Sequence, residues 1–348
     1  MKSLNHSILL FFVFLLTSCK QGTGYKDAVK FSRNDFPETD TLKAIKVKFD
    51  SLLNKPLTLH IYDSLLLTTD FDSRRMLQIY NLKTGHKIGE RIDFGQDKGE
   101  MLAPIFVEND DKTILLYDRR KGILHEYDIS EFVKEYKPKA IRSITLEEKV
   151  SPIALMGNDL LGYYYCSPHP LHRFNISGHK TKEMLNFPKW NVNYSDRENK
   201  AAFTFSFSTN GIDKFVLCYN WTDLIEFYDK NGKLIKRMHG PNQFYPSFKE
   251  RRMNNVSVVI RVSNQNHYAY YFPTHVGNEV YILYDGDRVC PQADQLSHEI
   301  FVFDWNGNPI KRYILNEGVI TFSVDQIHKR IYGISDTPQY HIVEFPYI

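Results

Sequence analysis

The sequence has few of the short motifs that mark common enzymes and cofactor-binding proteins. It contains no Gly-Lys-Ser/Thr phosphate loop, no Gly-x-Ser-x-Gly nucleophile elbow and no His-Glu-x-x-His zinc motif. Only four cysteines occur in 348 residues, and no two form a Cys-x-x-Cys pair, which excludes a zinc knuckle or dithiol motif of that spacing. The net charge is only +3, with basic and acidic residues interleaved, which argues against nucleic-acid binding. We therefore expect no cofactor, no metal and no nucleic-acid partner.

The most specific motif lies at the N-terminus. After one early lysine, the apolar run Ile8–Leu16 is typical of a secretory signal and is too short to cross a bilayer, which requires about 20 helical residues. The run ends in Leu16-Thr17-Ser18-Cys19, which resembles the lipobox of bacterial lipoproteins. The resemblance implies that residues 1–18 are a signal peptide and that Cys19 carries lipid. An ordinary cleaved signal with an incidental Cys19 is the alternative.

The lipobox also predicts a location. One acyl chain gives only marginal membrane binding, whereas the two or three chains of a lipoprotein anchor it permanently. Cys19 is followed by Lys20 rather than by the aspartate that directs inner-membrane retention in enterobacterial lipoproteins, so we expect the outer membrane, on its periplasmic or its cell-surface face. Residues 19–40 are polar and lack an apolar pattern, which predicts a flexible tether.

Three cysteines remain beyond the lipobox, namely Cys166, Cys218 and Cys290. Each lies in or beside an apolar, aromatic segment, which favours three buried thiols. One disulfide plus one thiol is the alternative in an oxidising periplasm.

One pattern recurs along residues 41–348: a hydrophobic strand, a polar turn, and a second strand that carries an aromatic residue near its end. In the clearest copy these strands are expected at residues 215–219 and 224–229, followed by an Asn-Gly turn. The aromatic markers stand 42 to 53 residues apart, except for one interval of 76, and they are Tyr80, Tyr127, Phe174, Phe227, Phe303 and Phe345. Periods in the forties, each with several short strands, predict propeller blades.

The six copies predict an all-β fold, a six-bladed β-propeller. The long interval predicts an insertion of about 30 residues between the fourth and fifth markers. The last copy stops before its outer strand, and residues 42–49, which alternate apolar and basic, are expected to supply that strand from the N-terminal side. A seventh blade within residues 241–279 is the alternative.

The lipobox, some 300 residues of degenerate blades and the recurring aromatic strand together resemble the TolB-like six-bladed propeller lipoproteins of Bacteroidetes. The resemblance covers residues 42–348 and is one of pattern. It implies the fold and an exported location, and it supplies no catalytic motif.

The insertion contains the candidate ligand-binding residues, which are Arg251, Arg252, Tyr268, Tyr270 and Tyr271. Arginines suit carboxylates or phosphates, and aromatic faces suit sugar rings. Long loops in compact folds are often functional. The alternative is that residues 256–262 and 267–273 are two further strands, with Tyr268, Tyr270 and Phe272 in the core between blades.

Two weaker clusters remain. The first contains soft metal ligands, and its two prolines favour a stiff loop over a metal site: Cys166, His169, His172 and His179. The second contains acids at strand ends that either line the central channel or are ordinary turn residues: Asp70, Asp118, Asp285 and Asp287.

These features favour a non-enzymatic lipoprotein whose propeller is a binding or scaffold module for a protein or glycan partner. The rival hypothesis is an exported polysaccharide hydrolase or lyase that uses channel-lining acids. Two carboxyl groups about 5–9 Å apart in a deep pocket would favour the enzyme.

Overall fold

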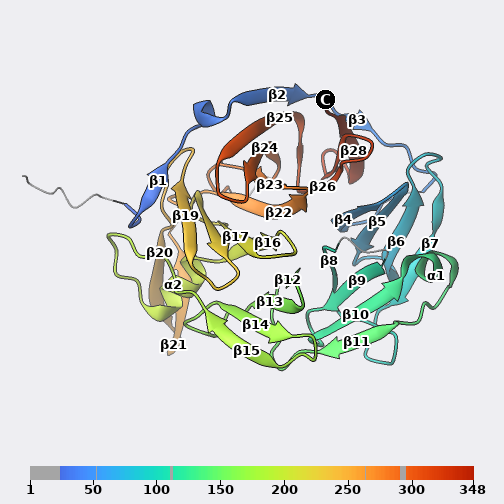
Figure 1. Ribbon diagram of the computed structural model, residues 1–348, viewed down its shortest axis with the longest axis horizontal. Coiled ribbons are helices and arrows are strands. Elements are labelled where there is room, and N and C mark those ends of the chain that lie inside the picture. Colours follow the sequence, from blue (N-terminus) through green and yellow to red (C-terminus); the bar gives the residue numbers. More distant parts are fainter. Residues whose placement is uncertain (1–23, 52, 110–112, 263, 291–294) are drawn as a thin grey trace, which may run out of the picture.

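The computed structural model describes residues 24–51, 53–109, 113–262, 264–290 and 295–348. Six sheets stand in a ring, each with four antiparallel strands, and two of them have a parallel fifth strand at the outer edge (Figure 1). The predicted signal peptide and Cys19 lie outside the described residues, so both remain predictions.

Each blade is given from its innermost strand outward. Blade one contains β4 (Pro56–Tyr62), β5 (Leu65–Asp70), β6 (Arg75–Asn81) and β7 (Lys87–Asp93). Blade two contains β8 (Pro104–Val107), β9 (Thr113–Asp118), β10 (Ile123–Asp128) and β11 (Arg142–Thr145). Blade three contains β12 (Ile153–Met156), β13 (Asp159–Tyr163), β14 (Leu171–Asn175) and β15 (Lys180–Met184).

The second half of the ring repeats this order. Blade four contains β16 (Phe205–Thr209), β17 (Lys214–Tyr219), β18 (Leu224–Asp229) and β19 (Leu234–His239). Blade five contains β22 (Tyr270–Val276), β23 (Glu279–Tyr284), β24 (Ser297–Asp304) and β25 (Pro309–Val319). Blade six contains β26 (Thr321–Asp325), β27 (Arg330–Ser335), β28 (His341–Pro346) and β3 (Ile45–Lys46).

The ring closes as the sequence predicts. Strand β3, from the N-terminal side, pairs antiparallel with β28, and Ile45 stands opposite Glu344. The Val47 N–H extends the pairing with a bond of 2.9 Å to the Ile342 carbonyl oxygen. The six-bladed prediction is therefore confirmed, and β3 covers the edge of β28 that would otherwise be free.

The alternative prediction of a seventh blade is wrong. Part of residues 241–279 forms the hairpin of β20 (Phe248–Met253) and β21 (Val256–Arg261), a separate two-stranded sheet, and the remainder leads into β22. Two strands cannot bury a face of their own against both neighbours, so the segment adds to the rim of the ring instead of widening it.

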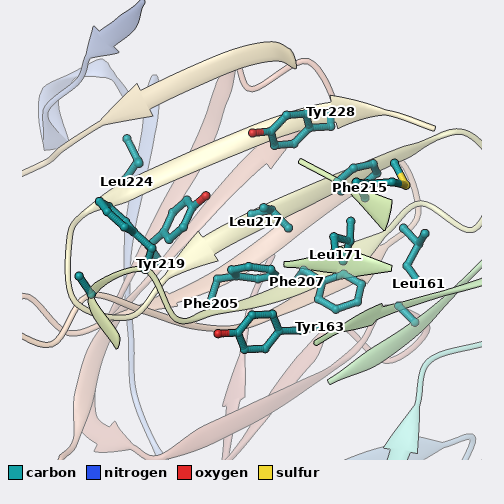
Figure 2. Close-up of a cluster of buried hydrophobic side chains, with 14 of the residues drawn as sticks. Leu161, Tyr163, Leu171, Phe205, Phe207, Phe215, Leu217, Tyr219, Leu224 and Tyr228 are labelled. Atoms are coloured by element: carbon teal, nitrogen blue, oxygen red, sulfur yellow. The ribbon is translucent and has the colours of Figure 1, made fainter. Parts of the chain in front are cut away.

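The blades are held together by side chains between adjacent sheets. Between blades three and four, Phe215 and Leu217 of β17 pack with Leu161 of β13, and all three are essentially inaccessible to solvent (Figure 2). Full burial of one such side chain contributes about 1.5–3 kcal/mol. The middle strands are buried on both faces, which explains their nearly continuous apolar sequences.

Two short helices lie in the connections. Helix α1 (Ile129–Lys134) follows β10. Helix α2 (Asp196–Ala202) precedes β16 and begins with a capping box in which Ser195 and Glu198 bond to each other's backbone N–H groups.

The expected tether is wrong from Tyr25 onward. Strand β1 (Ala28–Lys30) adds in parallel to β19, and β2 (Glu38–Leu42) adds in parallel to β25, so residues 25–42 form a strap around blades four and five (Figure 1). Tyr25, Phe31 and Phe36 of this strap are buried in the propeller core. The strap sequence is polar because its strands are outermost and expose one face.

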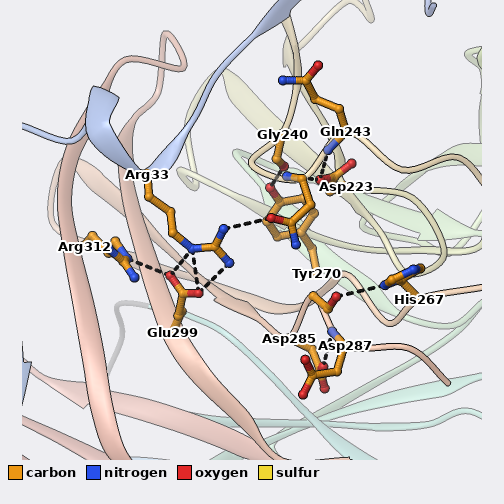
Figure 3. Close-up of polar contacts among 12 residues, drawn as sticks. Arg33, Asp223, Gly240, Gln243, His267, Tyr270, Asp285, Asp287, Glu299 and Arg312 are labelled. Atoms are coloured by element: carbon orange, nitrogen blue, oxygen red, sulfur yellow. Dashed lines mark hydrogen bonds and ion pairs between the residues drawn. The ribbon is translucent and has the colours of Figure 1, made fainter. Parts of the chain in front are cut away.

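A charged cluster pins the strap to blade five. Arg33 binds Glu299 through Nε (2.9 Å) and Nη2 (2.7 Å), and Arg312 donates to the other Glu299 oxygen at 2.6 Å (Figure 3). The Arg33 guanidinium also lies 5.6 Å from the centre of the Tyr284 ring. Paired, partly buried geometry of this kind holds the strap more firmly than an exposed ion pair does.

The cysteine expectation holds only in part. Cys218 is buried, and burial raises the pKa of its thiol well above the ordinary value, while Cys166 and Cys290 are exposed. The prediction of three buried thiols is therefore wrong for these two residues.

Candidate functional site

The two candidate arginines do not share a surface. Arg251 and Arg252 are consecutive, exposed residues of β20, and they stand opposite Val258 and Ser257 of β21. Successive side chains of a strand point to opposite faces, so one arginine faces outward while the other faces helix α2. A single ligand on one face of the hairpin therefore contacts only one of them.

The three candidate tyrosines differ in accessibility. Tyr270 is fully buried and donates its hydroxyl to the Gly240 carbonyl oxygen (Figure 3), as the alternative interpretation predicts. Tyr268 is half-buried, with its ring 5.7 Å from that of Trp221. Tyr271 is half-buried, and burial raises the pKa of its hydroxyl. Tyr270 is therefore a core residue, and the five candidates do not converge on one site.

The loop rich in histidine and cysteine shows no convergence either. His169 contacts a backbone carbonyl oxygen at 2.8 Å, His172 pairs with Glu148, and His179 pairs with Glu147 at 2.7 Å. Within the described ranges, no group of three or more His, Cys, Asp or Glu residues is placed to hold a metal ion.

The predicted acids serve the backbone. Asp118 is inaccessible to solvent and accepts N–H groups of Leu102 (2.7 Å), Ala103 (3.2 Å), Arg120 (3.0 Å) and Lys121 (3.2 Å). It thereby ties the connection that enters blade two to the turn after β9. These bonds are those of an ordinary structural turn residue.

Asp70 and Asp285 also accept backbone N–H groups. Asp70 accepts the N–H groups of Asn54 (3.1 Å) and Lys55 (3.2 Å). Asp285 accepts the N–H of Asp287 at 2.9 Å, and burial raises the pKa of Asp285 to about 6 (Figure 3). None of the four predicted acids lines the mouth of the central channel that is described next.

The innermost strands of all six blades end around one cavity. It has a volume of about 580 Å³, and we call it the channel mouth. Its polar lining side chains come from the ends of β4, β8, β16, β22 and β26 and the turns that follow them: His60, Asp63, Glu108, Asn109, Thr209, Thr274, His275 and Ser323. The volume is within the range of about 300–1,000 Å³ that is common for small-molecule sites.

Glu108 connects three blades across the mouth. Its Oε2 accepts the Ser208 hydroxyl at 3.0 Å and the His275 N–H at 3.3 Å, so blades two, four and five meet there. These two bonds hold the carboxylate in position between the blades.

His60, on strand β4 of the neighbouring blade, supplies a neutral imidazole. Its ring stacks on Phe106 with centres 5.3 Å apart and planes 14° apart, and the side chain is half-exposed to the channel. Enclosure by the wall lowers the pKa of His60 to about 4. At neutral pH the ring therefore offers one donor and one acceptor.

A second concavity lies beside the hairpin. It has a volume of about 940 Å³, and Arg197, Lys200 and Arg252 line it. Arg197 binds Glu250 at 3.4 Å and Lys200 donates to a backbone oxygen at 2.7 Å, so two of the three cations already maintain local structure. This groove is the gap between helix α2, the hairpin and the turn after β13.

Sequence reasoning missed His60, Glu108 and His275. Their position in the repeat could have indicated them. In each copy of the repeat the residue lies at or just before the turn that precedes the first strand recognised in the sequence. Positions at that offset in every copy meet at the axis of a propeller.

A known protein family has the same six-bladed architecture. The family described as TolB-like 6-blade propeller-like matches residues 35–327. This chain belongs to that family. The resemblance inferred from the sequence is thereby confirmed, and the match begins within the strap, ahead of the first blade.

Solved structures support the same fold. A protein of Bacteroides fragilis NCTC 9343 named as a putative exported protein is similar over 93% of this chain and 98% of its own, with a TM-score of 0.51 and 12% identity. A member of the DUF4221 family from Bacteroides vulgatus ATCC 8482 is similar over 89% and 96%, with a TM-score of 0.54 and 9% identity. At such identities the likeness is one of fold. A comparison with curated proteins gave no match.

No helix among the described residues has the length and apolar character that crossing a bilayer requires.

Proposed function

We propose that this TolB-like propeller is an exported, lipid-anchored binding protein whose channel mouth recognises a hydroxyl-rich ligand, such as the end of a glycan chain. The observation that carries the proposal is the composition of the mouth, where side chains from several blades place donors and acceptors around one cavity. A sugar offers the complementary set of hydroxyl donors and acceptors.

The mouth combines planar polar groups with aromatic surface. Glu108, Asn109 and the neutral ring of His60 supply flat hydrogen-bonding groups, and Tyr62 supplies an aromatic ring beside them. Aromatic rings pack against the apolar faces of sugars, and fixed polar groups set their orientation.

The same lining supports binding rather than hydrolysis. Asp63 and Glu108 are the carboxylates among the lining residues, and Glu108 already accepts two hydrogen bonds from the protein. Glycoside hydrolysis requires a carboxylic acid that donates a proton to the leaving group. The strand-end acids that the enzyme hypothesis requires are occupied by backbone N–H groups instead.

The proposed location rests on the lipobox. Cys19 is the expected lipid attachment site, and Lys20 favours the outer membrane over the inner one. The name of the Bacteroides fragilis relative is consistent with export. A partner for such a protein is therefore sought on either face of the outer membrane.

The test uses the chain from Lys20 onward, which contains every described residue, on an immobilised array of bacterial and plant oligosaccharides. We expect the wild-type chain to bind a subset of the array. Glu108→Gln and His60→Ala are each expected to weaken the affinity for these oligosaccharides at least tenfold. Glu126→Gln, in the same blade but at an outer ion pair with Arg142, is the matched control and is expected to bind normally. Equal binding by all variants would refute the site, and shortening of a bound glycan would establish the hydrolase instead.

A further inference from the structure

We propose that one face of the β20–β21 hairpin lies on the anionic lipid surface to which Cys19 is anchored. This inference rests on the lipid anchor of the proposed function. It adds an oriented contact between a described surface and the membrane.

The register of the hairpin separates its residues into two faces. Cross-strand partners share a face, and residues alternate along each strand. The inward face contains Phe248, Glu250, Arg252, Ser257, Val259 and Arg261. The outward face contains Lys249, Arg251, Met253, Val256, Val258 and Ile260.

The inward face is fixed to the propeller. Glu250 accepts the Ser195 hydroxyl at 2.9 Å, and its backbone N–H donates to Glu198 at 2.8 Å, which joins β20 to helix α2. Val259 packs on the core between blades three and four, and Arg261 lies 4.7 Å from the centre of the Trp221 ring. The hairpin therefore presents its other face outward.

The outward face combines aliphatic and basic side chains, and none of its six residues is acidic. Met253 is 58% exposed and Val256 is 61% exposed at the tip. Among the described residues, Lys249 and Arg251 have no ion-pair partner. Aliphatic groups that enter the lipid interface, flanked by cations that meet phosphate, are the composition that membrane-surface elements use.

The chain enters the propeller at the base of this hairpin. The ring of Tyr25 stands 5.2 Å from that of Tyr245, which precedes β20 by three residues. Strands β1, β20 and β21 lie on the same side of the ring (Figure 1). Membrane contact at this side is therefore set by how far Cys19 can lie from Gly24.

That distance is short. Five residue steps separate Cys19 from Gly24, and they span about 18 Å at most. The hairpin strand itself extends about 17 Å from its base. A lipid on Cys19 thus keeps the membrane within reach of the hairpin, which a tether of about twenty residues would not do.

Binding to vesicles tests the contact without the lipid anchor. The chain from Lys20 onward is mixed with vesicles of phosphatidylglycerol and phosphatidylethanolamine, or of phosphatidylcholine alone. We expect at least tenfold tighter binding to the anionic vesicles at low salt. Arg251→Gln is expected to weaken it about fivefold, and Lys249→Gln with Arg251→Gln about 25-fold. Arg252→Gln removes the same charge from the inward face and is expected to change binding less than twofold.

Hydrogen exchange of the lipidated wild-type protein in the same anionic vesicles is the second measurement, and we expect protection at residues 249–260. Equal binding to neutral vesicles, or equal losses in the Arg251 and Arg252 variants, would overturn the proposal. Protection in native membranes without binding to pure lipid would assign the face to a protein. Glycan binding is measured on the same unlipidated chain, so a failure of the membrane contact is distinguishable from a failure of the channel mouth.

Discussion

Phe36→Ala tests whether the strap is part of the fold. The Phe36 ring is 5% exposed, stacks on Phe301 with centres 4.9 Å apart, and meets Phe303 edge-on at 5.3 Å. Removal of a buried phenyl ring costs about 3–5 kcal/mol, because apolar contacts are lost and a cavity remains. At about 2 °C per kcal/mol for a large domain, we expect the Tm to fall by about 6–10 °C.

The assay is thermal unfolding of the chain from Lys20 onward, combined with limited trypsin digestion at Arg33. Arg33 is protected in the wild type by its bonds to Glu299, and we expect faster cleavage there in the variant. Phe94→Ala, at a phenylalanine that is 59% exposed, is the matched control and is expected to shift the Tm by less than 1 °C. Wild-type Tm and cleavage rate in Phe36→Ala would show that the strap is not packed on blade five.

Three further predictions concern the anchor and the buried acids. Cys19→Ala is expected to move the protein from the membrane to the soluble fraction after a high-salt wash, and firm retention would contradict lipid attachment. Asp118→Ala is expected to lower the free energy of unfolding by about 2–4 kcal/mol in a urea titration, because the buried N–H groups that Asp118 accepts lose their acceptor. Glycan binding is expected to persist. A variant of full stability that no longer binds glycan would show that Asp118 belongs to the binding site. Burial raises the pKa of Asp285 from 3.8 to about 6 in the folded state. The unfolded state therefore ionises first as the pH rises between these values, and the free energy of unfolding falls. Above pH 7 this loss of stability reaches about 3 kcal/mol. Asp285→Asn should therefore raise the Tm at pH 7.5 but little at pH 4, with Asp287→Asn as the control; a gain that is independent of pH would refute this cause.

The middle strands of each blade were predictable and the innermost strands were not. Residues 215–219 form a continuous apolar run, and residues 224–229 are apolar except for Glu226 and Asp229, because neighbouring blades cover both faces of these strands. Strand β8 has only four residues, and β26 places serine between apolar residues because one side of it faces the channel. Runs of four or five residues are too short to stand out from the turns beside them, so neither these strands nor the channel mouth was predicted.

The strap escaped prediction for a different reason. Its burial depends on Tyr25, Phe31 and Phe36, three single aromatic residues separated by polar sequence. Parallel pairing to β19 and β25 depends on edges that exist only after the ring has formed. The pattern of apolar and polar residues within the segment does not indicate that these distant strand edges will pair with it.

The pairing of β3 with β28 also sets the order of events during folding. Its partners Ile45 and Glu344 are almost 300 residues apart, so the ring cannot close until nearly the whole chain has been synthesised. Contacts of such separation slow folding and prolong the lifetime of open, aggregation-prone states. If Cys19 carries lipid as proposed, the modification acts on a chain whose propeller is still unfinished, because Cys19 precedes every strand of the ring. The folding protein would then be held at the membrane before the two parts of its sixth blade have met.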